Sequence, residues 1–121
     1  MLLGLGGKQR SLDHARGTAR ALTQMGPSSV GTLSLMVIPG TPLHTDLERG
    51  AFVLPTATEM LLELRTLLEQ TEMRGMFYAN HASNYYPIRA RLPRDRAEAL
   101  GQLDAALAGR AALKLEWMRA Y

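Results

Sequence analysis

Cysteine is absent from this 121-residue chain, and long apolar runs are absent as well. Without cysteine the chain forms no disulfide, offers no thiolate to zinc or to an iron–sulfur cluster, and has no cysteine nucleophile. No apolar run approaches the ~20 residues of a membrane-spanning helix. The N-terminal residues show neither a basic leader nor a small-residue cleavage site. We therefore expect a cytoplasmic protein with no membrane partner.

Runs of like charge are also missing. The composition is 46% hydrophobic and 21% charged, with a net charge of +3, which is typical of a globular protein. A chain of this length buries roughly two-thirds of its unfolded surface, so we expect a single domain over residues 1–121. The densest basic stretch, Arg89–Arg96, holds four arginines without interleaved aromatic residues. We expect a solvated surface there, and nucleic acid is not an expected partner.

Four segments have the pattern of helices. Residues 11–25 begin at a possible cap, Ser11, and stop at Gly26-Pro27. Residues 43–49 follow a proline that suits a first helical turn, and Thr56–Glu59 has the spacing of a capping box. A last helix opens at Pro93 and stops near Gly109, after which Trp117 is expected to anchor the tail by packing its ring. The apolar stripes comprise Leu12, Ala15, Ala19, Leu22 and Met25; Met60, Leu61, Leu64, Leu67 and Leu68; and Leu100, Leu103 and Leu107.

Three segments have the pattern of strands, at residues 2–5, 30–38 and 75–80, whereas residues 87–92 have no clear pattern. Helical segments separate these strands, as in right-handed βαβ crossovers, which give a parallel sheet. The predicted class is α/β, with three βα units. Three strands cannot close a barrel and leave exposed edges, so we expect a partner subunit or further strands.

Glycines follow the first predicted strand, at Gly4, Gly6 and Gly7. They match neither a dinucleotide fingerprint, which needs glycine where Gln9 stands, nor a Walker loop, which needs glycine at Leu2. A simple turn and a loop that lets a ligand approach the backbone are both compatible with these residues.

The loops after the second and third predicted strands are the other sites of interest. Pro39–Pro42 is either helix punctuation or a ligand-binding loop at a strand's carboxyl end. Asn80–Tyr86 gathers amides, hydroxyls, an imidazole and rings, and is the best local candidate for binding. His81 suits either general acid–base chemistry or a hydrogen bond that fixes the loop. His14 and His44 show no pairing with each other or with a carboxylate at helical spacing, so we expect surface histidines and no metal site.

Three motifs occur in a characteristic order: Leu2–Gly7, Leu33–Leu43, and Asn80–Tyr85 followed by Leu92–Asp95. In this order they resemble the C-terminal part of radical S-adenosylmethionine enzymes, over essentially the entire chain. The most similar branch is that of the Fe–S oxidoreductases related to coproporphyrinogen dehydrogenase-like proteins. The resemblance implies a partial, TIM-like (β/α) barrel in which a [4Fe–4S] cluster cleaves S-adenosylmethionine to a 5′-deoxyadenosyl radical that abstracts hydrogen from a substrate.

The resemblance also implies roles for particular residues. The first motif and the end of the second correspond to strand ends that pack near the adenine of S-adenosylmethionine. The loop after the last strand corresponds to a place for substrate or barrel-floor contacts, with no catalytic role assigned. The implied cofactor-binding residues are Leu3, Gly4, Leu5, Gly6, Ile38, Pro39 and Gly40, and the substrate or loop candidates are Asn80, His81, Ser83 and Asn84.

The chain departs from the family in lacking its CxxxCxxC cluster loop. We therefore expect no radical chemistry and no independently bound cofactor from this chain alone. One hypothesis is that it is a C-terminal fragment that contributes the adenine-side wall to a barrel completed by an N-terminal half. The alternative is a non-catalytic interaction or oligomerisation module that pairs with a second copy through its sheet edges.

Overall fold

A computed structural model describes all 121 residues and confirms the α/β class. No helix in it has the length and apolarity needed to cross a membrane. The elements in chain order are β1 (Leu2–Leu3), α1 (Ser11–Met25), β2 (Ser29–Gly31), β3 (Leu33–Ser34), α2 (Pro42–Glu48), α3 (Ala57–Gln70), β4 (Gly75–Tyr78), β5 (Arg89–Leu92), α4 (Arg96–Leu107) and a 3₁₀ turn at Glu116–Met118.

The strands β2 and β3 are consecutive parts of one extended segment that is interrupted only at Thr32. The first part pairs with β4 in parallel, and the second part pairs with β1 in parallel. The Thr32 amide also donates to the Tyr78 carbonyl at 2.7 Å, which continues the contact with β4. The strands thus form a two-stranded parallel sheet, β1-β3, and a three-stranded mixed sheet, β2-β4-β5, and the segment Ser29–Ser34 runs through both. We refer to the two together as the sheet.

The predicted all-parallel sheet is wrong at its last strand. Residues 89–92, which have no clear sequence pattern, form β5, and this strand runs antiparallel to β4 with Phe77 opposite Ala90. The physical reason is the length of the connection, since residues 79–88 are too few to contain the helix of a parallel crossover. The third predicted βα unit is therefore a strand pair followed by a helix.

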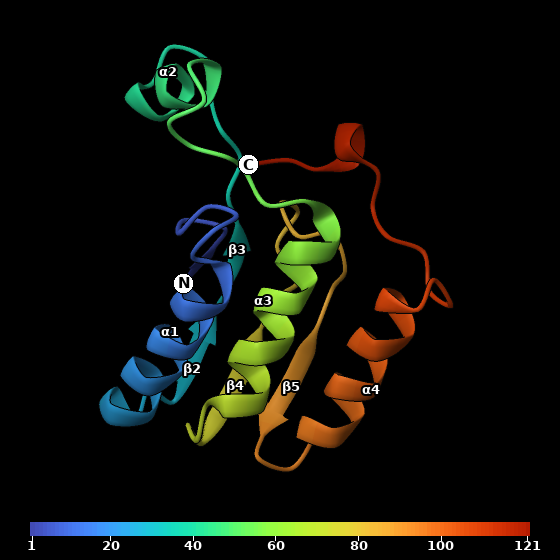
Figure 1. The fold of residues 1–121 in the computed structure, drawn as a ribbon. Helices are drawn as coiled ribbons and strands as arrows, with labels where there is room; N and C mark the ends of the chain where they lie inside the picture. The colour runs from blue at the N-terminus through green and yellow to red at the C-terminus, as the bar shows by residue number, and fades with distance from the viewer.

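All three long helices cover the same face of the sheet, where Figure 1 shows α1, α3 and α4 side by side. Between the helices and the sheet lies a core of 17 buried residues, which includes Phe77 from β4, Leu68 from α3 and Leu103 from α4. No helix covers the opposite face of the sheet in Figure 1. The short helix α2 stands apart from this body and contains no buried residue.

Local sequence signals predicted some of the helix ends correctly and others incorrectly. The capping box is confirmed, because the Thr56 hydroxyl accepts from the Glu59 amide and the Glu59 carboxylate accepts from the Thr56 amide. Gly26 ends α1 in the left-handed conformation at φ 59°. Ser11 is not a cap: Arg10 occupies that position, and Ser11 is buried inside the first helical turn.

Other boundaries and contacts differ from the predicted ones. The first two predicted strands are shorter in the structure, ending at Leu3 and at Ser34, and α4 begins at Arg96 rather than at Pro93. Within the predicted stripe of α1, Leu12 and Met25 are 42% and 71% exposed. They lie at the two ends of the helix, where Leu12 borders an open groove between α1 and α3.

Gly75 allows the closest approach between neighbouring strands. A Cβ atom there would lie 2.2 Å from the Ser28 carbonyl oxygen, a backbone atom that cannot move aside without disturbing β2. Because of this overlap, we expect Gly75→Ala to lower the free energy of unfolding by about 1–3 kcal/mol. Gly101→Ala is the matched control, since nothing lies within 4 Å of its Cβ position. Its expected gain is about 0.5–1 kcal/mol. Urea denaturation measures both, and equal effects of the two variants would contradict the steric argument.

Candidate functional site

The loops that follow β1, β3 and β4 leave the sheet at one edge, where the parallel strands end (Figure 1). Two of the predicted groups, Leu3–Gly6 and Asn80–Asn84, lie on either side of the end of β3. They are joined to it by the hydrogen bonds Leu35 N to Leu3 O, at 2.9 Å, and Ser34 N to Ser83 Oγ, at 3.1 Å. The third group, Ile38–Gly40, lies further along, on the segment that leads to α2.

A buried carboxylate holds the glycine loop in place. Glu63 on α3 is fully buried and accepts from the Gly4 amide at 3.1 Å and from the Ser11 hydroxyl at 2.7 Å. His14 Nδ1 lies 2.7 Å from the same carboxylate. These three contacts offset the cost of burying an acidic side chain. Glu63 thereby fixes the loop after β1 to the first turn of α1.

The two histidines expected at the surface without partners both have carboxylate neighbours. The His14 side chain is only 29% exposed, and its partner Glu63 is 49 positions away, so no local spacing could indicate the pair. His44 Nδ1 lies 3.6 Å from the Glu48 carboxylate four residues later on α2. The expectation of no pairing at helical spacing is therefore wrong for His44, although this exposed pair contributes little stability.

The implied adenine-side residues divide into buried and exposed ones. Leu3 is buried in the core, whereas Leu5 is 54% exposed and Ile38 is 45% exposed. Gly4 has φ of 86°, and a Cβ atom on it would lie 2.8 Å from Met60 Cε. This glycine therefore serves close packing inside the protein, and the exposed apolar side chains of Leu5 and Ile38 are the groups that a ligand could contact.

The polar loop after β4 is bound to the end of β3 by buried side chains. Asn84 accepts from the Ser34 hydroxyl at 2.7 Å and donates its amide to the Thr32 carbonyl at 2.7 Å. Ser83 accepts from the Ser34 amide. Both loop residues are at most 3% exposed. Their polar atoms are therefore used within the protein, and Asn80, which is exposed, and His81, which is half-buried, are the residues left for contacts with other molecules.

His81 makes the loop-fixing hydrogen bonds that were one of its two predicted roles. Its Nδ1 accepts from the Ser83 amide at 3.1 Å and lies 2.9 Å from the Ser83 hydroxyl. Because Nδ1 accepts, the proton of the neutral ring is on Nε2. No carboxylate forms an ion pair or a hydrogen bond with the ring.

Arg119 is the main residue at this edge that sequence reasoning missed. Its buried guanidinium donates to the Ser83 carbonyl at 2.7 Å, to the Leu35 carbonyl at 2.9 Å and to the Tyr85 hydroxyl at 2.6 Å. It also lies over the Tyr85 ring, 4.1 Å from the centroid. Trp117, the expected anchor of the tail, is 80% exposed, so that prediction is wrong. Arg119 anchors the tail instead.

Tyr85, which accepts from Arg119, is held in its protonated form by burial and by Glu116. Burial raises the pKa of the Tyr85 phenol to about 12, and the hydrogen bond that it donates to Glu116 at 2.7 Å acts in the same direction. The neighbouring positive charge of Arg119 opposes this shift. The folded state therefore favours the protonated phenol. The stability that the protonated Tyr85 contributes is present below about pH 10 and is lost as the pH rises from about 10 to about 12.

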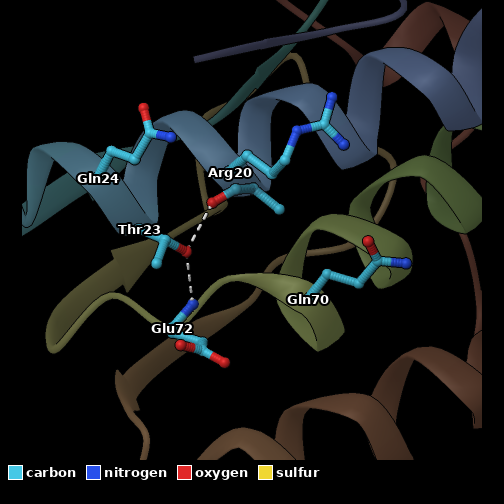
Figure 2. Close-up of a pocket in the computed structure, with 6 residues that line it drawn as sticks. Arg20, Thr23, Gln24, Gln70 and Glu72 are labelled. Carbon is cyan, nitrogen blue, oxygen red and sulfur yellow. Dashed lines mark hydrogen bonds between the residues drawn. The ribbon is translucent and has the colours of Figure 1, made fainter.

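A groove of about 290 Å³ lies at the far ends of α1 and α3 (Figure 2). At its centre, Thr23 donates to the Ala19 carbonyl at 2.8 Å and accepts from the Glu72 amide at 2.9 Å. No ion pair joins Arg20 to Glu72 across it. The Thr23 hydroxyl is satisfied by the protein itself, so this groove gives no chemical indication of a ligand.

The residues present do not fit an iron–sulfur cluster. The chain has no cysteine, and no group of three or more His, Asp or Glu side chains gathers where it could hold a metal ion. Comparison with models of known protein families, with curated proteins and with solved structures finds no match.

The different roles of Arg119 and Trp117 lead to a direct test. We expect Arg119→Gln to lower the free energy of unfolding by about 2–4 kcal/mol, because it removes charge-assisted hydrogen bonds to buried carbonyls. Trp117→Ala should change it by less than about 0.5 kcal/mol, as for an exposed side chain. Urea denaturation measures both values. If Trp117→Ala lowered the free energy of unfolding more than Arg119→Gln, the tryptophan ring and not Arg119 would be the anchor of the tail.

Proposed function

We propose that this chain is the C-terminal part of a radical S-adenosylmethionine barrel and forms the adenine-side wall of its cofactor pocket without being catalytic alone. The observation that carries the proposal is the one-sided sheet. In (β/α) barrels the helices lie outside, and the other face of the strands lines the interior. Here α1, α3 and α4 cover one face, and no helix covers the other (Figure 1).

The unpaired edge of the sheet supports the same proposal. The strand β1 pairs only with β3, in parallel, so its outer edge is open to another parallel strand. The N-terminal half of a barrel, with its cysteine loop, supplies such a strand. Because β5 is antiparallel, unlike the strands of a strictly parallel barrel, the proposal puts the junction with the N-terminal half at β1.

The chemistry at the strand ends agrees with a purine base as the neighbouring group. Leu5 and Ile38 follow adjacent strands and expose apolar side chains, while Glu63 holds the loop that carries Leu5. Such contacts accept a flat base without providing charge. The cluster, when bound, supplies the radical chemistry from residues outside this chain, and we place the assembled protein in the cytoplasm.

The experiment is reconstitution of a split enzyme. The partner is taken from a radical S-adenosylmethionine enzyme that shares the three motifs. Its cysteine-bearing N-terminal half is loaded with the cluster under anaerobic, reducing conditions and is then mixed with this chain. We expect 5′-deoxyadenosine, measured by chromatography, to exceed the amount formed by the N-terminal half alone by at least about tenfold. Leu5→Asp should reduce this gain, because it places a charge against the base.

Two controls make the outcome decisive. The enzyme's own C-terminal half must restore cleavage with the same N-terminal half, which shows that the split is functional. Leu62→Asp introduces the same charge at a leucine of α3 that is 41% exposed, and it should leave cleavage unchanged. If the enzyme's own half restores cleavage and this chain does not, the proposal fails.

The second candidate function is an interaction module, which the open edge of β1 favours. Because the Met1 and Leu3 carbonyls accept from β3, the amide of Leu2 points outward and is free to pair with a second copy. This function predicts a dimer in sedimentation velocity that Leu2→Pro dissociates, since proline removes the outward donor. A chain that remains monomeric at all concentrations contradicts it.

A further inference from the structure

The structure separates the four arginines of residues 89–96 into two pairs with different roles. Arg94 forms a two-pronged ion pair with Asp95, at 2.8 Å for Nε–Oδ1 and 2.9 Å for Nη2–Oδ2. Arg96 points to the other side and donates to the carbonyl of Thr71 at the end of α3. These two arginines are therefore engaged within the protein.

The other pair, Arg89 and Arg91, is free. Both residues are exposed, and neither guanidinium takes part in an ion pair or a hydrogen bond. They alternate along β5 with Ala90 and Leu92, which are buried in the core under the helices. Both arginines consequently extend from the face of the sheet that has no helix over it.

The neighbouring strand adds an apolar and aromatic floor between these charges. Register places Met76 of β4 beside Arg91 and Tyr78 beside Arg89. The Arg89 guanidinium lies 5.8 Å from the centroid of the Tyr78 ring. A cavity of about 440 Å³ opens on this face and is lined by Met76, Arg89, Ala90, Arg91, Arg94 and Asp95. That volume suits a small molecule.

We propose that this face binds a small organic dianion, in which a flat or apolar body separates two carboxylate or phosphate groups. Residues two apart on a strand have Cα atoms about 7 Å apart, so each anionic group has its own guanidinium. Arginine matches carboxylate and phosphate oxygens with paired donors. Met76 lines the cavity and contacts the body of the ligand, and the Tyr78 ring lies at its border, beside the Arg89 guanidinium. This inference requires no partner chain, and it uses the same uncovered face that the proposed barrel would turn toward its interior.

A small ligand fits this face better than a nucleic-acid strand. A single strand requires a continuous basic groove with several stacking rings. Here Asp95 and Glu98 interrupt the positive charge, since both line an adjoining cavity together with Arg89 and Arg94. Tyr78 is the only ring on β4 or β5 that faces away from the helices. Two arginines without ion pairs beside one ring are sufficient to bind a dianion and too few to bind a single strand of nucleic acid.

The test is a titration of the isolated chain with 2,6-naphthalenedicarboxylate, a flat ring with a carboxylate at each end, and in parallel with naphthalene-2,6-diphosphonate, which has the same body with a phosphonate at each end as a stand-in for phosphate. Calorimetry gives the affinity, and amide NMR shifts give the location. We expect binding that shifts the amides of Met76–Tyr78 and Arg89–Arg91. The probe that binds more tightly identifies the preferred anionic group. Arg89→Gln and Arg91→Gln should each weaken binding by about tenfold, since each removes a charge-assisted contact.

Arg20→Gln is the matched control, because it removes the same charge from an exposed arginine of α1 that has no ion pair and lies by the groove in Figure 2. It should leave the affinity unchanged. An equal loss in this control would show that only net charge matters and would overturn the proposal. Equal affinity for 2-naphthoate, which carries one carboxylate, would contradict the need for two anions. Tighter binding of an oligothymidylate at these same amides would replace the proposal with a nucleic-acid surface.

Discussion

The extended segment from Ser29 to Ser34 is the constraint on which the rest of the structure depends. Its first half pairs with β4 and its second half with β1, so a single stretch of backbone joins strands that are far apart in the sequence. The loops after β1 and β4 flank its end, and each is held by hydrogen bonds to it. Disturbing this segment would displace the core and the candidate site together.

Buried polar groups complete the edge at which the strands end. Glu63 joins the glycine loop to the first turn of α1, and Asn84 joins the polar loop to β3. Arg119 joins the C-terminal tail to the polar loop and to the residue that follows β3. Such groups are costly to bury without partners, and here each has several. The loop that carries Leu5 is therefore held by buried contacts, as preorganised binding requires, whereas Ile38 lies on the exposed segment that leads to α2.

Much of the fold could be predicted from local sequence signals. The capping box at Thr56, the left-handed Gly26 and the apolar stripe of α3 act within a few residues and appear in the structure as predicted. Glu63 also carried a signal, because it interrupts the apolar stripe beside Leu64. A charge on a buried face indicates a buried partner without identifying it. The strand β5 also carried a signal, because Ala90 and Leu92 alternate with Arg89 and Arg91 at the period of a half-buried strand. The segment is only four residues long, and alanine and arginine are weak strand formers, so this signal was missed.

By itself, the sequence determined the α/β class, the helices and the absence of thiolate ligands, because these depend on composition and on periodicity within one segment. Only the tertiary structure decided the direction of β5, the pairing of His14 with Glu63, and the anchoring of the tail by Arg119 instead of Trp117. Each of these features depends on groups that are not linked by the periodicity of one helix or strand. Tertiary packing likewise left the guanidinium groups of Arg89 and Arg91 free on the uncovered face, since a strand exposes alternate residues and the helices occupy only one side.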